Sequence, residues 1–85
     1  MTSKQEKALK IVKDKFKDKY PEYGVDVNGA LVFSMIPNDD PGFGVVLDNF
    51  YVVNPDNGDV YAVNPAFYQE AFTQALEHPF YTDIR

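Results

Sequence analysis

Apolar residues recur at helical spacing near the start of the chain and predict a first helix over Ser3–Lys19. At about 100° per residue, one arc of this helix is apolar and the opposite arc carries acidic residues. Ser3 and Glu6 have the spacing of a capping box, in which each side chain bonds the other residue's backbone amide. Pro21 disfavours helical geometry at Tyr20, so we expect the helix to end there. The apolar arc comprises Ala8, Leu9, Val12, Phe16 and Tyr20.

The middle of the chain shows the alternation that is typical of β-strands. Pro21–Gly24 is predicted to form a turn, and Val25 and Val27 then indicate a short strand that is interrupted at Asn28-Gly29, a dipeptide that signals either a hairpin or a bulge. Residues 30–36 predict a clearer strand, in which alternate side chains point to opposite faces. One face is expected to carry Leu31, Phe33 and Met35, and the other Ala30, Val32, Ser34 and Ile36.

A second hairpin is predicted after the turn-rich loop at residues 37–42. A strand over Phe43–Asn54 leads into the turn residues 54–58, and a strand over Asp59–Val63 follows. Within Phe50–Val53 both alternating faces are apolar. Either two helices cover opposite faces of the sheet, or one face is left for a partner. We favour coverage, because large exposed apolar patches are uncommon on monomers.

A second helix is predicted over Ala66–His78, with Asn64 as its N-cap and Pro65 at its start. Pro79 closes it, and residues 80–85 form a tail. Consecutive strands joined by short turns imply an antiparallel sheet. The predicted fold is therefore one α+β domain over residues 1–85, with a three- or four-stranded antiparallel sheet and the order α-β-β-β-α. The buried stripe of the second helix would comprise Phe67, Tyr68, Ala71, Phe72, Ala75 and Leu76.

Charge is divided unevenly along the 85 residues, whose net charge is −5. Residues 1–23 hold seven lysines and four acids, whereas residues 24–84 hold nine acids and no lysine or arginine. An acidic surface of this kind disfavours nucleic acid and favours a basic partner. The lysines of the first helix are interleaved with acids and are expected to form a solvated face. No apolar run approaches the ~20 residues that a membrane span needs.

The sequence offers little material for catalysis. There is no cysteine, so thiolate metal sites and cysteine nucleophiles are excluded. Asp56 to Asp59 resembles part of a calcium loop, but its glycine is out of register with the other ligands, so a structural turn is preferred. Asp39 and Asp40 lie in a loop that is expected to be solvated. His78 is the only histidine. We therefore predict no catalytic residue, no metal ligand and no cofactor.

Aromatic side chains are the stronger candidates for a binding surface. The chain has six tyrosines and seven phenylalanines. The tyrosines cannot all lie at the centre of so small a core, so packing at the core edge is preferred for them, and an interface is the alternative because tyrosine is a common interface anchor. Tyr51 and Tyr61 are predicted to lie across from each other on the hairpin, with Phe50 and Val52 on the other face. The residues predicted to bind a partner are Phe50, Tyr51, Tyr61, Asp39 and Asp40.

The hairpin resembles the PepSY domain family. The resemblance lies in residues 51–54 and 58–61, which comprise a strand, an amide residue, a turn glycine, an acidic residue and a valine. The upstream helix with Ala8 and Leu9, ending near Tyr20, is also similar. The chain differs from the family in its loop at residues 37–42 and in the helix after Asn64. The resemblance implies a small non-catalytic module, often extracytoplasmic and linked to protease inhibition.

These observations predict a non-catalytic protein-binding or inhibitory module, either PepSY-like or an acidic immunity-type protein that masks a basic site. One alternative is a small enzyme or a ligand- or cation-binding domain that uses Asp39, Asp40 or His78. Another is a homodimeric structural protein.

The first residues lack the apolar segment of a signal peptide. The expected location is cytoplasmic if the chain is full length, and extracytoplasmic if it is a trimmed PepSY-like module.

Overall fold

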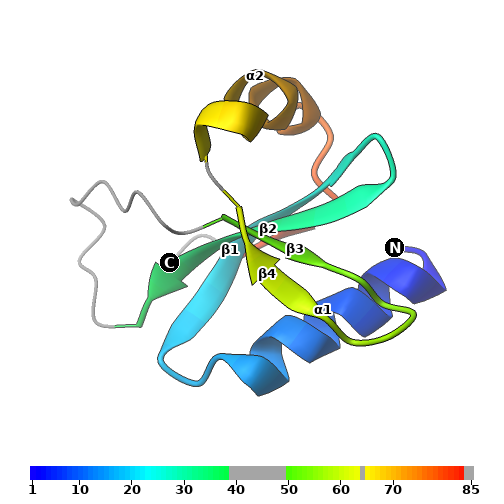
Figure 1. Ribbon diagram of the computed structural model, residues 1–85, viewed down its shortest axis with the longest axis vertical. Coiled ribbons are helices and arrows are strands. Elements are labelled where there is room, and N and C mark those ends of the chain that lie inside the picture. The colour runs from blue at the N-terminus through cyan, green and yellow to red at the C-terminus, as the bar shows by residue number, and fades with distance from the viewer. Residues whose placement is uncertain (39–49, 64, 84–85) are drawn as a thin grey trace.

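The structure, a computed structural model, describes residues 1–38, 50–63 and 65–83, with side chains in the last range from residue 70. An antiparallel sheet lies between two helices (Figure 1). The sheet has five strands in the order β4-β3-β2-β1-β5, so the α+β class is confirmed with more strands than predicted. The elements are α1 (Ser3–Lys15), β1 (Lys19–Val27), β2 (Ala30–Pro37), β3 (Phe50–Val53), β4 (Val60–Ala62), α2 (Pro65–Ala75) and β5 (Tyr81–Thr82).

The N-cap of α1 is Thr2. Its hydroxyl accepts a hydrogen bond from the Gln5 N–H at 3.1 Å, and its own N–H donates to Gln5 Oε1 at 2.8 Å. This is a capping box. The box predicted for Ser3 and Glu6 is therefore wrong by one residue in each position, because Thr2 and Ser3 are adjacent hydroxyl residues and Ser3 is already the first residue of the helix.

Replacing Thr2 with alanine is expected to lower the unfolding free energy by about 1 kcal/mol, because the Gln5 N–H in the first turn loses the hydroxyl that accepts its hydrogen bond. Ser3→Ala also removes a hydroxyl group, at the next position in the chain, and should leave stability almost unchanged. Urea denaturation of the two variants measures the difference. An equal loss from Ser3→Ala would contradict the assignment of Thr2 as the cap.

α1 ends earlier than predicted, and a strand follows after residues 16–18. Phe16 is extended (φ −112°, ψ 108°) while its N–H still donates to Val12 O at 3.0 Å. β1 then runs through Pro21, where a turn was predicted, and its register against β2 shifts between Pro21 and Tyr23. Proline has no N–H to give to a ladder, so a bulge is where a sheet tolerates it. Tyr20, the residue before Pro21, favours an extended backbone, and in the structure this extended backbone is part of a strand.

A two-residue turn joins β1 to β2. Asn28 and Gly29 both have positive φ, at 52° and 91°, which is the conformation that tight hairpins require. The Gly29 N–H donates to Asp26 Oδ1 at 2.7 Å and holds the turn. Of the hairpin or bulge predicted at this dipeptide, the structure has the hairpin, and the strand that precedes it is nine residues long.

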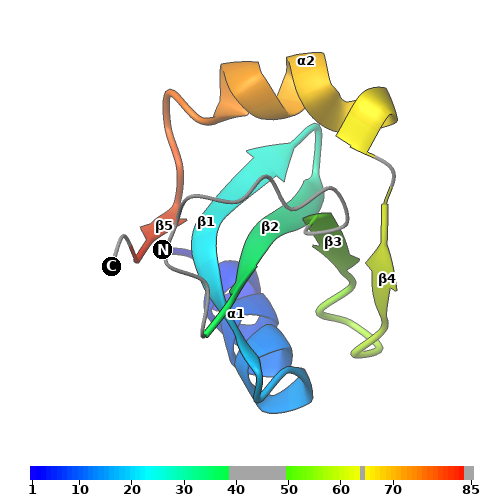
Figure 2. The ribbon, with the colours of Figure 1, turned by 90° about the vertical axis from the view of Figure 1, so that its left-hand side faces the viewer.

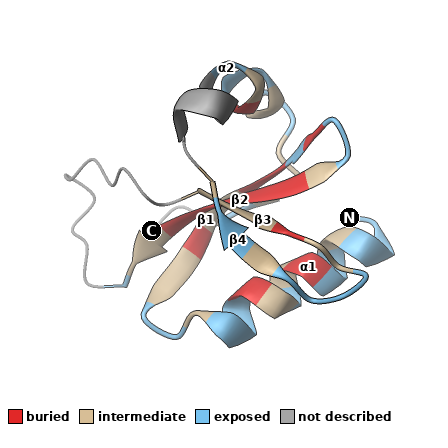
Figure 3. Ribbon diagram, in the orientation of Figure 1, coloured by how far each residue is buried: buried red, intermediate tan, exposed pale blue. Residues whose placement is uncertain are grey.

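α1 and α2 cover opposite faces of the sheet (Figures 1 and 2). Alternate residues of β2 divide between the faces as predicted, and the buried residues gather in the central strands and on the inner side of α1 (Figure 3). The apolar stretch in β3 is therefore covered on both sides. The α1 face buries Ala8, Val12, Leu31, Phe33, Met35 and Val53, and the α2 face buries Val25, Val27, Val32 and Phe72.

The fifth strand was predicted as part of a tail. β5 pairs with Tyr23 and Gly24 of β1. The Phe80 N–H donates to Gly24 O at 2.9 Å, and the Asp83 N–H donates to Glu22 O at 2.8 Å. These bonds place the Phe80 ring edge-on to Phe33, with centroids 5.5 Å apart and planes at 90°. Two paired residues are too few to show a periodic pattern in the sequence.

The remaining predictions differ in their bounds or lie outside the described residues. β4 covers the centre of the predicted strand 59–63, and α2 ends at Ala75, three residues before its predicted end. The part of the predicted strand before Phe50, the cap at Asn64 and the side chains of Phe67 and Tyr68 lie outside the described residues.

Candidate functional site

The turn between β3 and β4 is held by its own asparagines. Asn54 Oδ1 accepts the Asp56 N–H and Asn57 Oδ1 accepts the Asp59 N–H, each at 2.9 Å. The Gly58 N–H donates to Asn54 O at 2.8 Å, and Gly58 takes a positive φ of 80°. Side-chain amides that bond the backbone two residues on are typical of turns. The predicted structural turn is confirmed.

Tyr51 and Tyr61 lie on opposite faces of the sheet, which contradicts the prediction that they face each other. The register pairs Tyr51 with Ala62 and Tyr61 with Val52. Paired residues share a face and neighbours in sequence alternate, so Tyr51 belongs to the α1 face and Tyr61 to the α2 face. Phe50 and Val52 do lie on the face opposite to Tyr51, as predicted.

Tyr51 and Phe50 contribute mainly to packing. The Tyr51 ring contacts Phe16 with centroids 4.7 Å apart, and its hydroxyl accepts a hydrogen bond from the Lys19 ammonium at 2.9 Å. Phe50 stacks on Phe72 of α2 with centroids 4.4 Å apart. Both residues are half-buried. Of the aromatic residues predicted to bind a partner, Tyr61 is the exposed one, with 49% of its surface accessible.

Asp39 and Asp40 lie outside the described residues, so their predicted role is still a prediction. His78 is exposed just beyond α2, where its backbone N–H donates to Ala75 O at 3.0 Å. Among the described residues, no three His, Asp or Glu side chains are grouped as metal ligands. Neither described helix is long and apolar enough to span a membrane.

β4 forms one edge of the sheet, and two of its residues direct their backbone groups outward. The Asn54 N–H donates to Asp59 O at 2.8 Å and the Val63 N–H donates to Phe50 O at 3.0 Å. Hydrogen-bonded pairs alternate along an antiparallel ladder, so Tyr61 also bonds inward, to Val52. The N–H and C=O groups of Val60 and Ala62 therefore point away from β3. No described strand lies beyond them.

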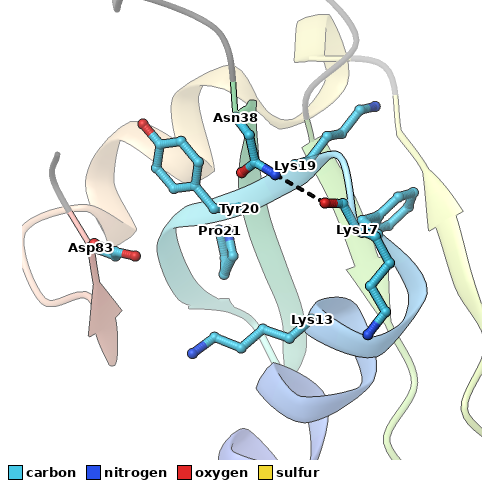
Figure 4. A pocket seen from close by; sticks show the side chains of 8 residues that line it. Lys13, Lys17, Lys19, Tyr20, Pro21, Asn38 and Asp83 are labelled. Carbon is cyan, nitrogen blue, oxygen red and sulfur yellow. Dashed lines mark hydrogen bonds between the residues drawn. The ribbon is translucent and has the colours of Figure 1, made fainter.

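A hollow of about 400 Å³ lies beside the end of α1 (Figure 4). It is built from parts of the chain that are distant in sequence, which explains why the sequence did not reveal it. The Asn38 side-chain amide donates to Lys17 O at 2.9 Å and ties the end of β2 to the loop after α1. The lining residues are Lys13, Phe16, Lys17, Lys19, Tyr20, Pro21, Asn38 and Asp83.

The three lysines of this hollow do not form a single anion site. Their ammonium groups point away from one another (Figure 4). Lys13 Nζ lies 5.3 Å from the centre of the Tyr81 ring, and Lys19 Nζ lies 5.2 Å from that of Tyr51. Lys17 Nζ is 4.0 Å from the Asp14 carboxylate at an exposed position. The hollow therefore has a rim of mixed charge, with Asp83 among its lining residues.

Comparison of the chain with protein-family models, with curated proteins and with solved structures returns no match. The resemblance to the PepSY family thus stays a prediction. Among the described residues, the candidate site is the outer edge of β4, because the exposed Tyr61 side chain and the outward backbone groups lie together there.

Proposed function

We propose that this protein is a non-catalytic module that binds another protein, and that its partner is basic. The observation that carries the proposal is the segregation of charge. Between Tyr20 and Ile84 the chain contains no lysine or arginine. The acids Asp26, Asp56, Asp59, Glu70 and Glu77 are all exposed in that part of the chain.

Exposed acids without neighbouring lysine or arginine in the sequence attract a positively charged partner over several ångströms and accelerate its association. It also repels the phosphates of nucleic acids. Tyr61 adds a large exposed ring of the kind that anchors protein interfaces. An inhibitor or immunity-type protein that masks a basic site has these properties, and a PepSY-like role in protease inhibition is compatible with them.

The proposal is tested by affinity capture from native lysate with the immobilised chain. We expect a basic protein to be enriched at low ionic strength and lost as salt is raised, because exposed charges are screened. The comparison variant changes Asp56 and Asp59 to Asn and Glu70 and Glu77 to Gln. The described hydrogen bonds of Asp56 and Asp59 are made by their backbone groups, so the turn should persist.

The matched control changes Lys4, Lys7 and Lys10 to Gln, which alters charge at the basic end of the molecule. It should capture the same protein as the wild type, whereas the acid-neutralised variant should capture about tenfold less. Failure to enrich any protein specifically, or equal capture by the acid-neutralised variant, would overturn the proposal.

A further inference from the structure

The outer edge of β4 provides backbone groups that another strand can use. Val60 and Ala62 are two residues apart, so each presents an N–H and a C=O in the spacing of a ladder. Ala62 is exposed and Val60 is half-buried. Exposed edges are usually protected by a short strand length, by lysine and other charged residues, by proline or by a bulge. β4 is short, with three residues. Residues 59–63 contain neither lysine nor proline, and the β3–β4 register is continuous.

The side chains beside this edge offer different contacts on the two faces. On the α2 face, the Tyr61 ring stands next to Val52 and is 49% accessible. On the α1 face, Ala62 is small and lies beside the half-buried Tyr51. A strand added at this edge would place alternate side chains against the Tyr61 ring and into the space over Ala62. The aliphatic stem and charge of lysine or arginine both suit a tyrosine ring.

Charge is distributed unevenly along the same edge. Asp59 immediately precedes β4 and Asp56 lies in the adjoining turn, and both are exposed. At the other end, Ala62 pairs with Tyr51 of β3. Lys19 lies over the Tyr51 ring and donates to the Tyr51 hydroxyl at 2.9 Å. A basic side chain is therefore favoured at the Asp59 end of the edge and disfavoured at the Ala62 end.

We infer that β4 binds an extended basic segment of a partner protein, which adds to the sheet as a sixth strand. The inference rests on the proposed function, since it specifies where and how the basic partner binds. The outward N–H and C=O groups of Val60 and Ala62 supply the ladder, Tyr61 supplies the side-chain contact, and Asp56 and Asp59 select positive charge.

The direct test uses a synthetic peptide of alternating lysine and valine, about eight residues long. Added to the labelled full chain, it should shift the NMR signals of residues 60–62 in a saturable way. Hydrogen exchange at the Val60 and Ala62 amides should slow at least about tenfold, because these amides gain partners. The Tyr61 amide already bonds Val52 and should change little. The same peptide with N-methyl groups on alternate residues keeps its charge but cannot complete the ladder, so it should not saturate.

Three variants separate the contribution of the backbone ladder from that of the Tyr61 ring. Ala62→Pro removes an outward donor without breaking a bond to β3, and should weaken peptide binding about tenfold. Ala62→Ser keeps the donor and should bind as the wild type does. Tyr61→Ala keeps the ladder and loses the ring, and should weaken binding by a similar factor. Thermal unfolding of each variant establishes that the fold is intact.

The inference is overturned if the N-methylated peptide binds equally well, if the shifts map to α1 or the lysine hollow, or if Tyr61→Ala and Ala62→Pro bind normally. It is also overturned if the chain alone forms a dimer that Ala62→Pro dissolves, since the occupant is then a second copy. If Ala62→Pro still captures the basic protein from lysate, the proposed function stands and the edge inference fails.

Discussion

Replacing Phe33 with alanine is expected to lower the unfolding free energy by about 3–5 kcal/mol. Phe33 is fully buried in the central strand β2, on the face that α1 covers, and its ring contacts Phe80. Truncation removes the apolar surface that the Phe33 ring buries on folding. It also leaves a cavity that neighbouring residues on β1 and β3 can only partly fill. A chain of 85 residues has about 4–13 kcal/mol of total stability, so this change would consume a large part of it.

Urea denaturation followed by circular dichroism measures this loss. The matched control is Tyr61→Ala, which also truncates an aromatic residue of a strand but at an exposed position. Its effect should stay within about 0.5 kcal/mol. If Phe33→Ala cost no more than Tyr61→Ala, the position of the core in the sheet would be contradicted.

Replacing Gly24 with alanine is expected to cost about 1–3 kcal/mol, because it overpacks the site where β5 joins the sheet. A Cβ at this position would lie 2.9 Å from Phe33 Cε1 and 2.9 Å from Phe80 Cε1. Phe33 is fully buried and cannot move away, whereas Phe80 is half-buried and can. The new methyl group should therefore displace Phe80 and loosen the hydrogen bond from its N–H to Gly24 O.

A double-mutant cycle with Phe80→Ala tests this mechanism. In the Phe80→Ala background, the added methyl group meets only one ring, so Gly24→Ala should cost at least about 0.5 kcal/mol less than in the wild type. Additive losses would show that the two positions do not compete for the same space. Faster hydrogen exchange at the Phe80 amide in Gly24→Ala would report the loosened strand independently.

The sequence predicted elements whose signals are local and periodic. The alternation of Leu31, Phe33 and Met35 was sufficient to assign the faces of β2, because side chains in a strand alternate strictly. The turn at Asn28-Gly29 was also predictable, since few residues accept its positive φ. The helix end was predicted too late because Pro21 is compatible both with a helix stop and with a bulged strand. The neighbouring strand β2 decides between these, and it comes later in the chain.

The candidate site was only partly predictable, because it depends on register. Tyr61 was chosen as a binding candidate from its residue type, and that role stays a prediction; the face on which it lies depends on the pairing of Tyr51 with Ala62. A shift by one residue moves every side chain to the other face, and the sequence of the turn does not determine such a shift uniquely. The position of β4 at the edge of the sheet likewise depends on the order of the strands.

The pairing of β5 with β1 has a consequence for the order in which the fold assembles. Each of the β1–β2 and β3–β4 pairs joins neighbouring segments, whereas β5 must return across almost the whole sheet-forming part of the chain to reach Gly24. Closing so long a loop carries an entropic cost that the short pairing of β5 with β1 offsets only once the rest of the sheet exists. We therefore expect the chain to complete β5 last when it folds and to release it first when it opens.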